Sequence, residues 1–119
     1  MVTCHFHPDY VLWIDALEIQ YITFIDPKGL LRLQWTDPKI EFCNTIKELE
    51  ERLQPSCSDK KIVLNSFILS TTVSETLQFW WEKNKSDLHS KNVICLNERD
   101  CIEVMVRKIM NINIIDESY

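Results

Sequence analysis

The sequence predicts a single-domain α/β fold. Its mixed sheet begins with an antiparallel hairpin, continues as β-α-β-α with parallel strands, and is covered by about three helices. Strand-like alternation in the first third of the chain, and helices alternating with apolar runs in the rest, support this fold. Right-handed crossovers make the strands that they join parallel. The 119 residues, 45% apolar and 26% charged, suffice for one core, so residues 1–119 are expected to form one domain.

An antiparallel hairpin is predicted in the first third of the chain. Residues 19–25 are rich in β-branched and aromatic side chains, and residues 31–35 alternate apolar with polar side chains, as in a half-buried strand. Between them, Asp26-Pro27-Lys28-Gly29 places proline at the second turn position and glycine where a positive φ is needed. These patterns predict two strands joined by a type I turn with a glycine bulge.

Two further strands are predicted upstream of this hairpin, at residues 2–6 and 10–14. A short helix is an alternative for residues 8–17, because Pro8 suits a first helical turn. Either arrangement leaves the predicted hairpin as the antiparallel part of the sheet.

Two capping boxes predict helices in the second half. Thr45-Ile-Lys-Glu48 begins a helix that runs to about residue 53, and Thr72-Val-Ser-Glu75 begins another that runs to about residue 83. In such a box the hydroxyl accepts a hydrogen bond from a free amide at the helix start, and the glutamate reaches back to the first residue.

Two buried strands alternate with these helices. Residues 61–69 and 92–96 are too apolar to have a face in water, as is typical of central strands covered on both sides. Asn97 is expected to cap a last helix. The apolar side chains of that helix repeat at helical spacing and are Ile102, Met105, Val106 and Ile109.

Charge and composition exclude several classes of function. The net charge is −5, and basic residues alternate with acidic ones, so no basic face for duplex nucleic acid is expected. No apolar run reaches the ~20 residues of a membrane span. Gly29 is the only glycine, whereas dinucleotide and P-loop sites need several. We therefore expect no cofactor, no duplex nucleic acid and no membrane as partners.

The cysteines indicate a reducing environment. They are Cys4, Cys43, Cys57, Cys95 and Cys101. No C-x-x-C pair occurs, and an odd number leaves one thiol over in any disulfide scheme. Free thiols are ordinary in the cytoplasm, and the first residues lack the pattern of a secretion signal, so a cytoplasmic location is expected.

A first candidate site is a metal centre near the start of the chain. On a strand, His5 and His7 would project to one face and Asp9 would follow them. Two imidazoles and a carboxylate can hold a catalytic zinc ion and leave one position for water. Exposed terminal histidines with no ligand are the alternative.

A second candidate is a ligand site where a buried strand ends and a helix begins. Its hydroxyls come from Ser70, Thr71, Thr72 and Ser74, with Asn97 nearby and Asn65 and Ser66 as further polar groups. Ligands of open α/β sheets bind at the carboxyl ends of strands, and free helix amides attract anions. A phosphate-bearing molecule would suit this place. Simple helix capping by Thr72 is the alternative.

A third candidate is the aromatic run Phe79, Trp80 and Trp81. Consecutive helical residues point about 100° apart, so one narrow stripe cannot bury all three, and at least one of Phe79 and Trp81 is expected to be partly exposed. Exposed tryptophan is enriched at protein–protein contacts. Burial of the run in a crowded small core is the alternative.

These features favour a non-catalytic cytoplasmic interaction or regulatory domain that binds a protein partner, or a second copy of itself as a homodimer, through an exposed apolar and aromatic surface. One alternative is a small-molecule sensor or phosphodiester-processing enzyme that uses the turn from Ser70 to Ser74. A second is a metal-dependent hydrolase built on His5, His7 and Asp9. No local signature of nucleophilic catalysis occurs, so no catalytic residue is assigned.

Overall fold

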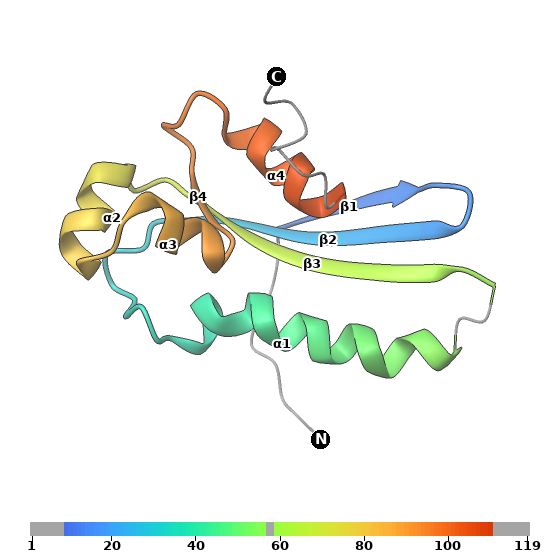
Figure 1. Cartoon of the computed structure of the whole chain (residues 1–119). Helices are drawn as coiled ribbons and strands as arrows, with labels where there is room; N and C mark the ends of the chain where they lie inside the picture. Colours follow the sequence, from blue (N-terminus) through green and yellow to red (C-terminus); the bar gives the residue numbers. More distant parts are fainter. Residues whose placement is uncertain (1–8, 57–58, 111–119) are drawn as a thin grey trace.

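The computed structural model describes residues 9–56 and 59–110 (Figure 1). A four-stranded sheet carries α1 on one face and α4 on the other, and α2 and α3 lie at the end of the sheet where β2 and β3 finish. The elements are β1 Tyr10–Asp15, β2 Ile19–Lys28, α1 Pro38–Leu53, the short 3-10 helix η1 Gln54–Ser56, β3 Lys61–Ser70, α2 Ser74–Trp81, α3 Lys85–Ser90, β4 Val93–Cys95 and α4 Cys101–Met110.

The sheet has the strand order β1-β2-β3-β4. β1 is antiparallel to β2, whereas β2, β3 and β4 are parallel to one another. The predicted fold class is therefore confirmed: a mixed sheet with an antiparallel hairpin first and parallel strands afterwards. The predicted strands over residues 10–14, 61–69 and 92–96 correspond to β1, β3 and β4. The alternative helix over residues 8–17 is wrong, and the predicted strand over residues 2–6 lies outside the described residues.

The hairpin lies one strand earlier than predicted. β1 and β2 are joined by a tight turn in which Ala16 and Ile19 exchange backbone hydrogen bonds of 2.9 and 3.3 Å. Residues 31–35 form no strand, and Gly29 does not adopt a positive φ. Pairing with β3 overrides the local turn signal, because it keeps β2 extended as far as Lys28.

Pro27 is tolerated inside β2 because the position of its missing N–H faces the β1 side of the strand and not β3. The carbonyl of Lys28 accepts from the Thr71 amide, so Lys28 points to the β3 side and Pro27 to the side of β1. Among the described residues, β1 pairs with β2 only as far as Ile25. The missing N–H of Pro27 therefore interrupts no pairing with β1.

The first helix begins seven residues before the predicted start. Asp37 caps α1 by accepting from the Lys39 amide at 2.8 Å, and Pro38 occupies the first helical position. Thr45 is an exposed residue inside this helix and caps nothing. The predicted capping box there is wrong, because a stronger start signal precedes it.

The predicted helix over residues 72–83 corresponds to α2, but its predicted cap is wrong, and α3 follows it as a helix that the sequence did not predict. The Thr72 hydroxyl accepts from the Leu30 amide at 3.1 Å instead of capping α2. α2 ends at Trp81, and the next residue, Glu82, has a φ of 52°, in the left-handed region. Asn84 and Asp87 then form a capping box that begins α3.

The last helix is confirmed, but its cap and part of its buried face are not. Asn97 does not cap α4, because its side chain accepts from the Ser74 amide of α2 at 3.0 Å. Met105 and Ile109 are buried as expected, whereas Ile102 and Val106 are exposed. No helix among the described residues is long and apolar enough to cross a membrane.

The core occupies both faces of the sheet. Under α4, Met105 and Ile109 pack in one cluster with Tyr21, Phe67 and Ile94. Under α1, the cluster contains Ile46, Ile62 and Leu64. A third cluster joins α2 and α3 to the sheet and includes Leu30, Ile68, Leu77, Trp81 and Leu88.

Candidate functional site

Two side chains anchor α2 to the rest of the molecule. Leu77 is fully buried, and Trp81 is 9% exposed. The Trp81 indole N–H donates to the Leu33 carbonyl at 3.0 Å, and its ring lies 5.4 Å from the ring centre of Trp35. Trp81 therefore belongs to the core and not to a surface that a partner can reach.

The other two residues of the aromatic run lie on the surface. Phe79 is 84% exposed and Trp80 is 57% exposed. Together with Gln78 and Glu82 they line a shallow depression of about 450 Å³. We call this set of four residues the α2 aromatic surface. The exposure of Phe79 agrees with the expectation that at least one of Phe79 and Trp81 is partly exposed.

Two acidic residues lie in or beside the α2 aromatic surface. Glu75 and Glu82 are both exposed on or next to α2. Glu82 occupies a left-handed position at the helix end, where glycine is the residue with no steric penalty. A glutamate in this conformation costs some backbone stability. Its position puts a carboxylate beside the exposed aromatic rings.

The predicted ligand residues between Ser70 and Ser74 lie together and form hydrogen bonds with one another and with other residues of the protein. The Ser70 hydroxyl donates to the Thr72 carbonyl at 2.7 Å and accepts from the Thr72 amide at 3.0 Å. The Ser74 hydroxyl accepts from Gln78, and the Ser74 amide donates to Asn97. The Thr71 amide donates to the carbonyl of Lys28. These contacts shape the turn.

Asn65 and Ser66 do not join that turn. Both belong to β3, in which successive side chains point to opposite faces of the sheet. The neighbours of Asn65 on its own face, Val63 and Phe67, belong to the cluster under α4. Ser66 lies on the other face with Ile68.

Little of the candidate metal centre can be placed. His5 and His7 lie outside the described residues, and Asp9 is exposed just before β1. Within residues 9–56 and 59–110, no group of three or more histidine, cysteine, aspartate or glutamate side chains has an arrangement that could hold a metal ion. The remaining histidine, His89, lies 3.3 Å from Glu98.

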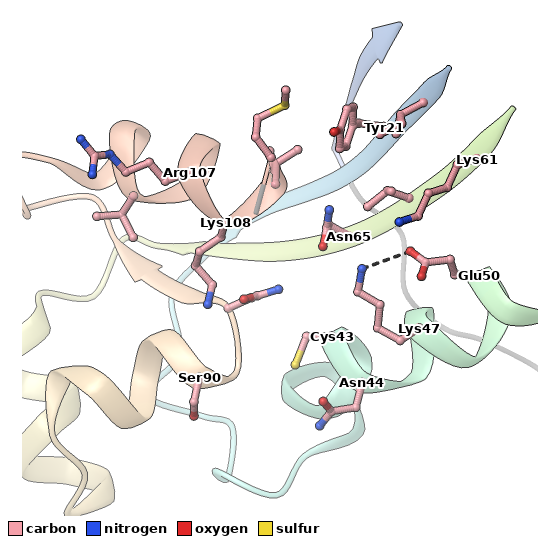
Figure 2. A pocket seen from close by; sticks show the side chains of 16 residues that line it. Tyr21, Cys43, Asn44, Lys47, Glu50, Lys61, Asn65, Ser90, Arg107 and Lys108 are labelled. Carbon is pink, nitrogen blue, oxygen red and sulfur yellow. Dashed lines mark hydrogen bonds and ion pairs between the residues drawn. The ribbon is translucent and has the colours of Figure 1, made fainter. Parts of the chain in front are cut away.

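A pocket that the sequence analysis did not identify lies beside β3 (Figure 2). β4 pairs only with Ile68, Leu69 and Ser70, so the earlier part of β3 has no strand next to it on this side among the described residues. A pocket of about 740 Å³ opens there between α1 and α4. We call it the β3-edge pocket.

The β3-edge pocket has a polar side and an apolar side. Its polar side chains include Lys47, Glu50, Lys61, Asn65 and Lys108. Its apolar side chains include Tyr21, Val63, Val104 and Ile109. Figure 2 shows that these side chains come from β2, β3, α1 and α4 and surround one space.

Side chains of α1 and η1 satisfy the backbone of β3 beside this pocket. The Glu50 carboxylate accepts from the Leu64 amide at 2.6 Å and from Lys47 at 3.1 Å. The Gln54 amide accepts from Ile62 at 2.9 Å and donates to Lys60 at 3.1 Å. This edge of β3 is therefore blocked by side chains in a way that disfavours pairing with another strand.

Burial shifts the pKa of two groups that line the pocket. Partial loss of water lowers the pKa of Lys108, because burial disfavours the charged form of an amine. Burial likewise raises the pKa of the Cys43 thiol, which keeps this thiol protonated and unreactive. Cys43, Cys95 and Cys101 are all free thiols.

The sequence contained one signal for this pocket. Asn65 interrupts the apolar run over residues 61–69, and a polar residue in a buried strand needs a partner. The other polar residues come from elements far apart in the chain, so no local spacing connects them. Lys108 lies one residue before the buried Ile109 and resembles an ordinary helix-end lysine.

Scans of protein-family models, of curated proteins and of solved structures give no match for this chain.

Proposed function

We propose that this protein is a non-catalytic interaction or regulatory domain that binds a protein partner through the α2 aromatic surface. The observation that carries the proposal is the 84% exposure of Phe79 beside the 57% exposure of Trp80. Folding gains little from aromatic rings left in water, whereas such rings are the side chains that dominate binding energy at protein interfaces.

The chemistry of the partner follows from the surroundings of these rings. The carboxylates of Glu75 and Glu82 flank them, and the whole chain carries a net charge of −5. A complementary partner offers an apolar pocket or side chain with lysine or arginine around it. A second copy of this chain has the same acidic character, so a different, basic protein is the better match.

The location of the protein is part of the same proposal. The described cysteines are free thiols, and free thiols fit a reducing compartment such as the cytoplasm. A cytoplasmic partner is accordingly the one to seek.

Photo-crosslinking in the source cell tests the proposal. We expect p-benzoylphenylalanine at position 79 or 80, in place of Phe79 or Trp80, to give a discrete crosslinked product. Leu17 is the matched control, because it is an apolar residue, 97% exposed, on the turn between β1 and β2. The composition of the product distinguishes a different protein from a second copy. Equal crosslinking at positions 17, 79 and 80 would contradict the proposal.

A further inference from the structure

The side-chain NH2 group of Asn65 is buried, and no described residue accepts a hydrogen bond from it. The side chain is 6% exposed, and Nδ2 has no hydrogen-bond acceptor among the residues that the structure describes. The Thr23 hydroxyl, on the neighbouring position of β2, is also buried without a partner. Unsatisfied buried donors are costly, and native proteins seldom retain them without a water or ligand to bind.

Asn65 lies at the β3-edge pocket, so a ligand in this pocket would be close enough to supply the missing hydrogen-bond acceptor. Asn65 lines the pocket and lies in the middle of the side chains drawn in Figure 2. Its Nδ2 atom is turned away from solvent. Because χ2 is a soft torsion in asparagine, we infer that the amide turns its hydrogens to the pocket when a ligand binds. A ligand oxygen in the pocket would then accept from this amide.

The charges around the pocket specify an anion. Lys47, Lys61, Arg107 and Lys108 supply four positive charges, and Glu50 supplies one negative charge. Arg107 is paired with Glu103, which does not line the pocket. Glu50 is paired with Lys47, whereas no carboxylate of the described residues forms an ion pair with Lys61 or Lys108. A phosphate monoester carries close to two negative charges at neutral pH, which matches the excess of two lysines.

The rest of the pocket accommodates an organic group. Tyr21, Val63 and Ile109 form its apolar side. The volume of about 740 Å³ lies within the range of pockets that hold small molecules, roughly 300–1,000 Å³. A free inorganic ion would leave most of this space, and all of its apolar side, without a contact.

We propose that the β3-edge pocket binds a small organic phosphate monoester, with its phosphate attracted by Lys61 and Lys108 and accepting from the Asn65 amide. This site differs from the α2 aromatic surface, so the protein would join a small-molecule site to a partner-binding surface. It also differs from the Ser70–Ser74 turn, whose serine hydroxyls are already occupied by internal hydrogen bonds.

Nuclear magnetic resonance with defined probes tests the site. The probes are adenosine 5′-monophosphate and glycerol 3-phosphate, each compared with its phosphate-free counterpart, and inorganic phosphate and citrate. We expect at least one monoester to shift the Asn65 side-chain resonances and the Tyr21 and Ile109 amides saturably. Binding of citrate or inorganic phosphate alone would overturn the proposed ligand class. No saturable shift by either monoester up to about 10 mM would overturn the site.

Lysine variants localise the binding. Lys108→Met and Lys61→Met are each expected to weaken binding of the monoester by about tenfold or more, the effect of one lost charge-assisted hydrogen bond. Lys39→Met is the control, because Lys39 is an exposed lysine of α1 that does not line the pocket. Unchanged affinity in both pocket variants, with the control behaving alike, would overturn the assignment.

Asn65→Leu separates a ligand site from a merely structural polar group. If Asn65 awaits a ligand, an apolar side chain of similar size leaves the urea midpoint of the free protein unchanged or raises it, and monoester binding falls by about tenfold or more. A clearly lowered midpoint would show that the amide is already satisfied without a ligand, for example by a buried water, and would overturn the proposal.

Discussion

Replacing Trp81 by alanine is expected to lower the free energy of unfolding by about 3–5 kcal/mol, the usual cost of removing a large buried aromatic side chain. Trp81 is 9% exposed, donates to the Leu33 carbonyl and contacts the ring of Trp35. Its loss would leave a cavity between α2 and the loop before α1, and it would leave the Leu33 carbonyl without its partner. Urea denaturation followed by far-ultraviolet circular dichroism measures the change.

The neighbouring tryptophan provides the control. Trp80→Ala is expected to change the free energy of unfolding by less than about 0.5 kcal/mol, because exposed side chains away from special features contribute little to stability. Trp80 is 57% exposed. Similar losses for the two variants would show that α2 is rotated about its axis relative to the structure, and Trp80 would then not be available to a partner.

The second large effect is expected for Phe67 in the central strand. Phe67 is 1% exposed and packs with Ile94, Met105 and Ile109 under α4. Phe67→Ala is expected to cost about 3–5 kcal/mol, because it removes most of a buried ring and leaves a cavity under α4. Thermal or urea unfolding of the purified variant measures this loss.

A conservative variant at the same position distinguishes packing from a general intolerance of change. Phe67→Leu keeps an apolar side chain and is expected to cost clearly less than the alanine variant. If Phe67→Ala were as stable as the wild-type protein, α4 would not cover β3 as described, and the β3-edge pocket would lose one of its walls.

The parallel strands of the core were predictable from the sequence, because a strand that is buried on both faces consists mostly of apolar residues. The runs over residues 61–69 and 92–96 contain few polar side chains, and both are strands of the sheet. The presence of an antiparallel hairpin was also predictable, because strand-like composition is local. These features depend on residues close together in the chain.

The position of the hairpin was not predictable from local turn chemistry. Asp26-Pro27-Lys28-Gly29 has the residues of a turn, but β2 continues through its first three residues because each of them pairs with β3 about 42 residues later. Thr72 shows the same competition. Its hydroxyl accepts from Leu30, a residue 42 positions away, and is therefore not available to cap α2.

Of the two candidate sites, one was partly visible in the sequence and the other depends entirely on tertiary structure. The aromatic run was visible in the sequence, but the division into exposed Phe79 and Trp80 and buried Trp81 depends on how α2 meets Leu33 and Trp35. The β3-edge pocket was hidden, because its lysines come from α1, β3 and α4 and are brought together only by the chain's topology.

The affinity of the partner identified by crosslinking is the most direct measure of the central claim, that Phe79 and Trp80 form the binding surface. Isothermal titration would compare the wild-type protein with Phe79→Ala/Trp80→Ala and with Leu17→Ala. We predict that the double variant binds at least about 30-fold more weakly, as expected when aromatic anchors worth about 2 kcal/mol or more are removed, and that the Leu17 variant binds like the wild type. Equal affinity of all three proteins would contradict the claim.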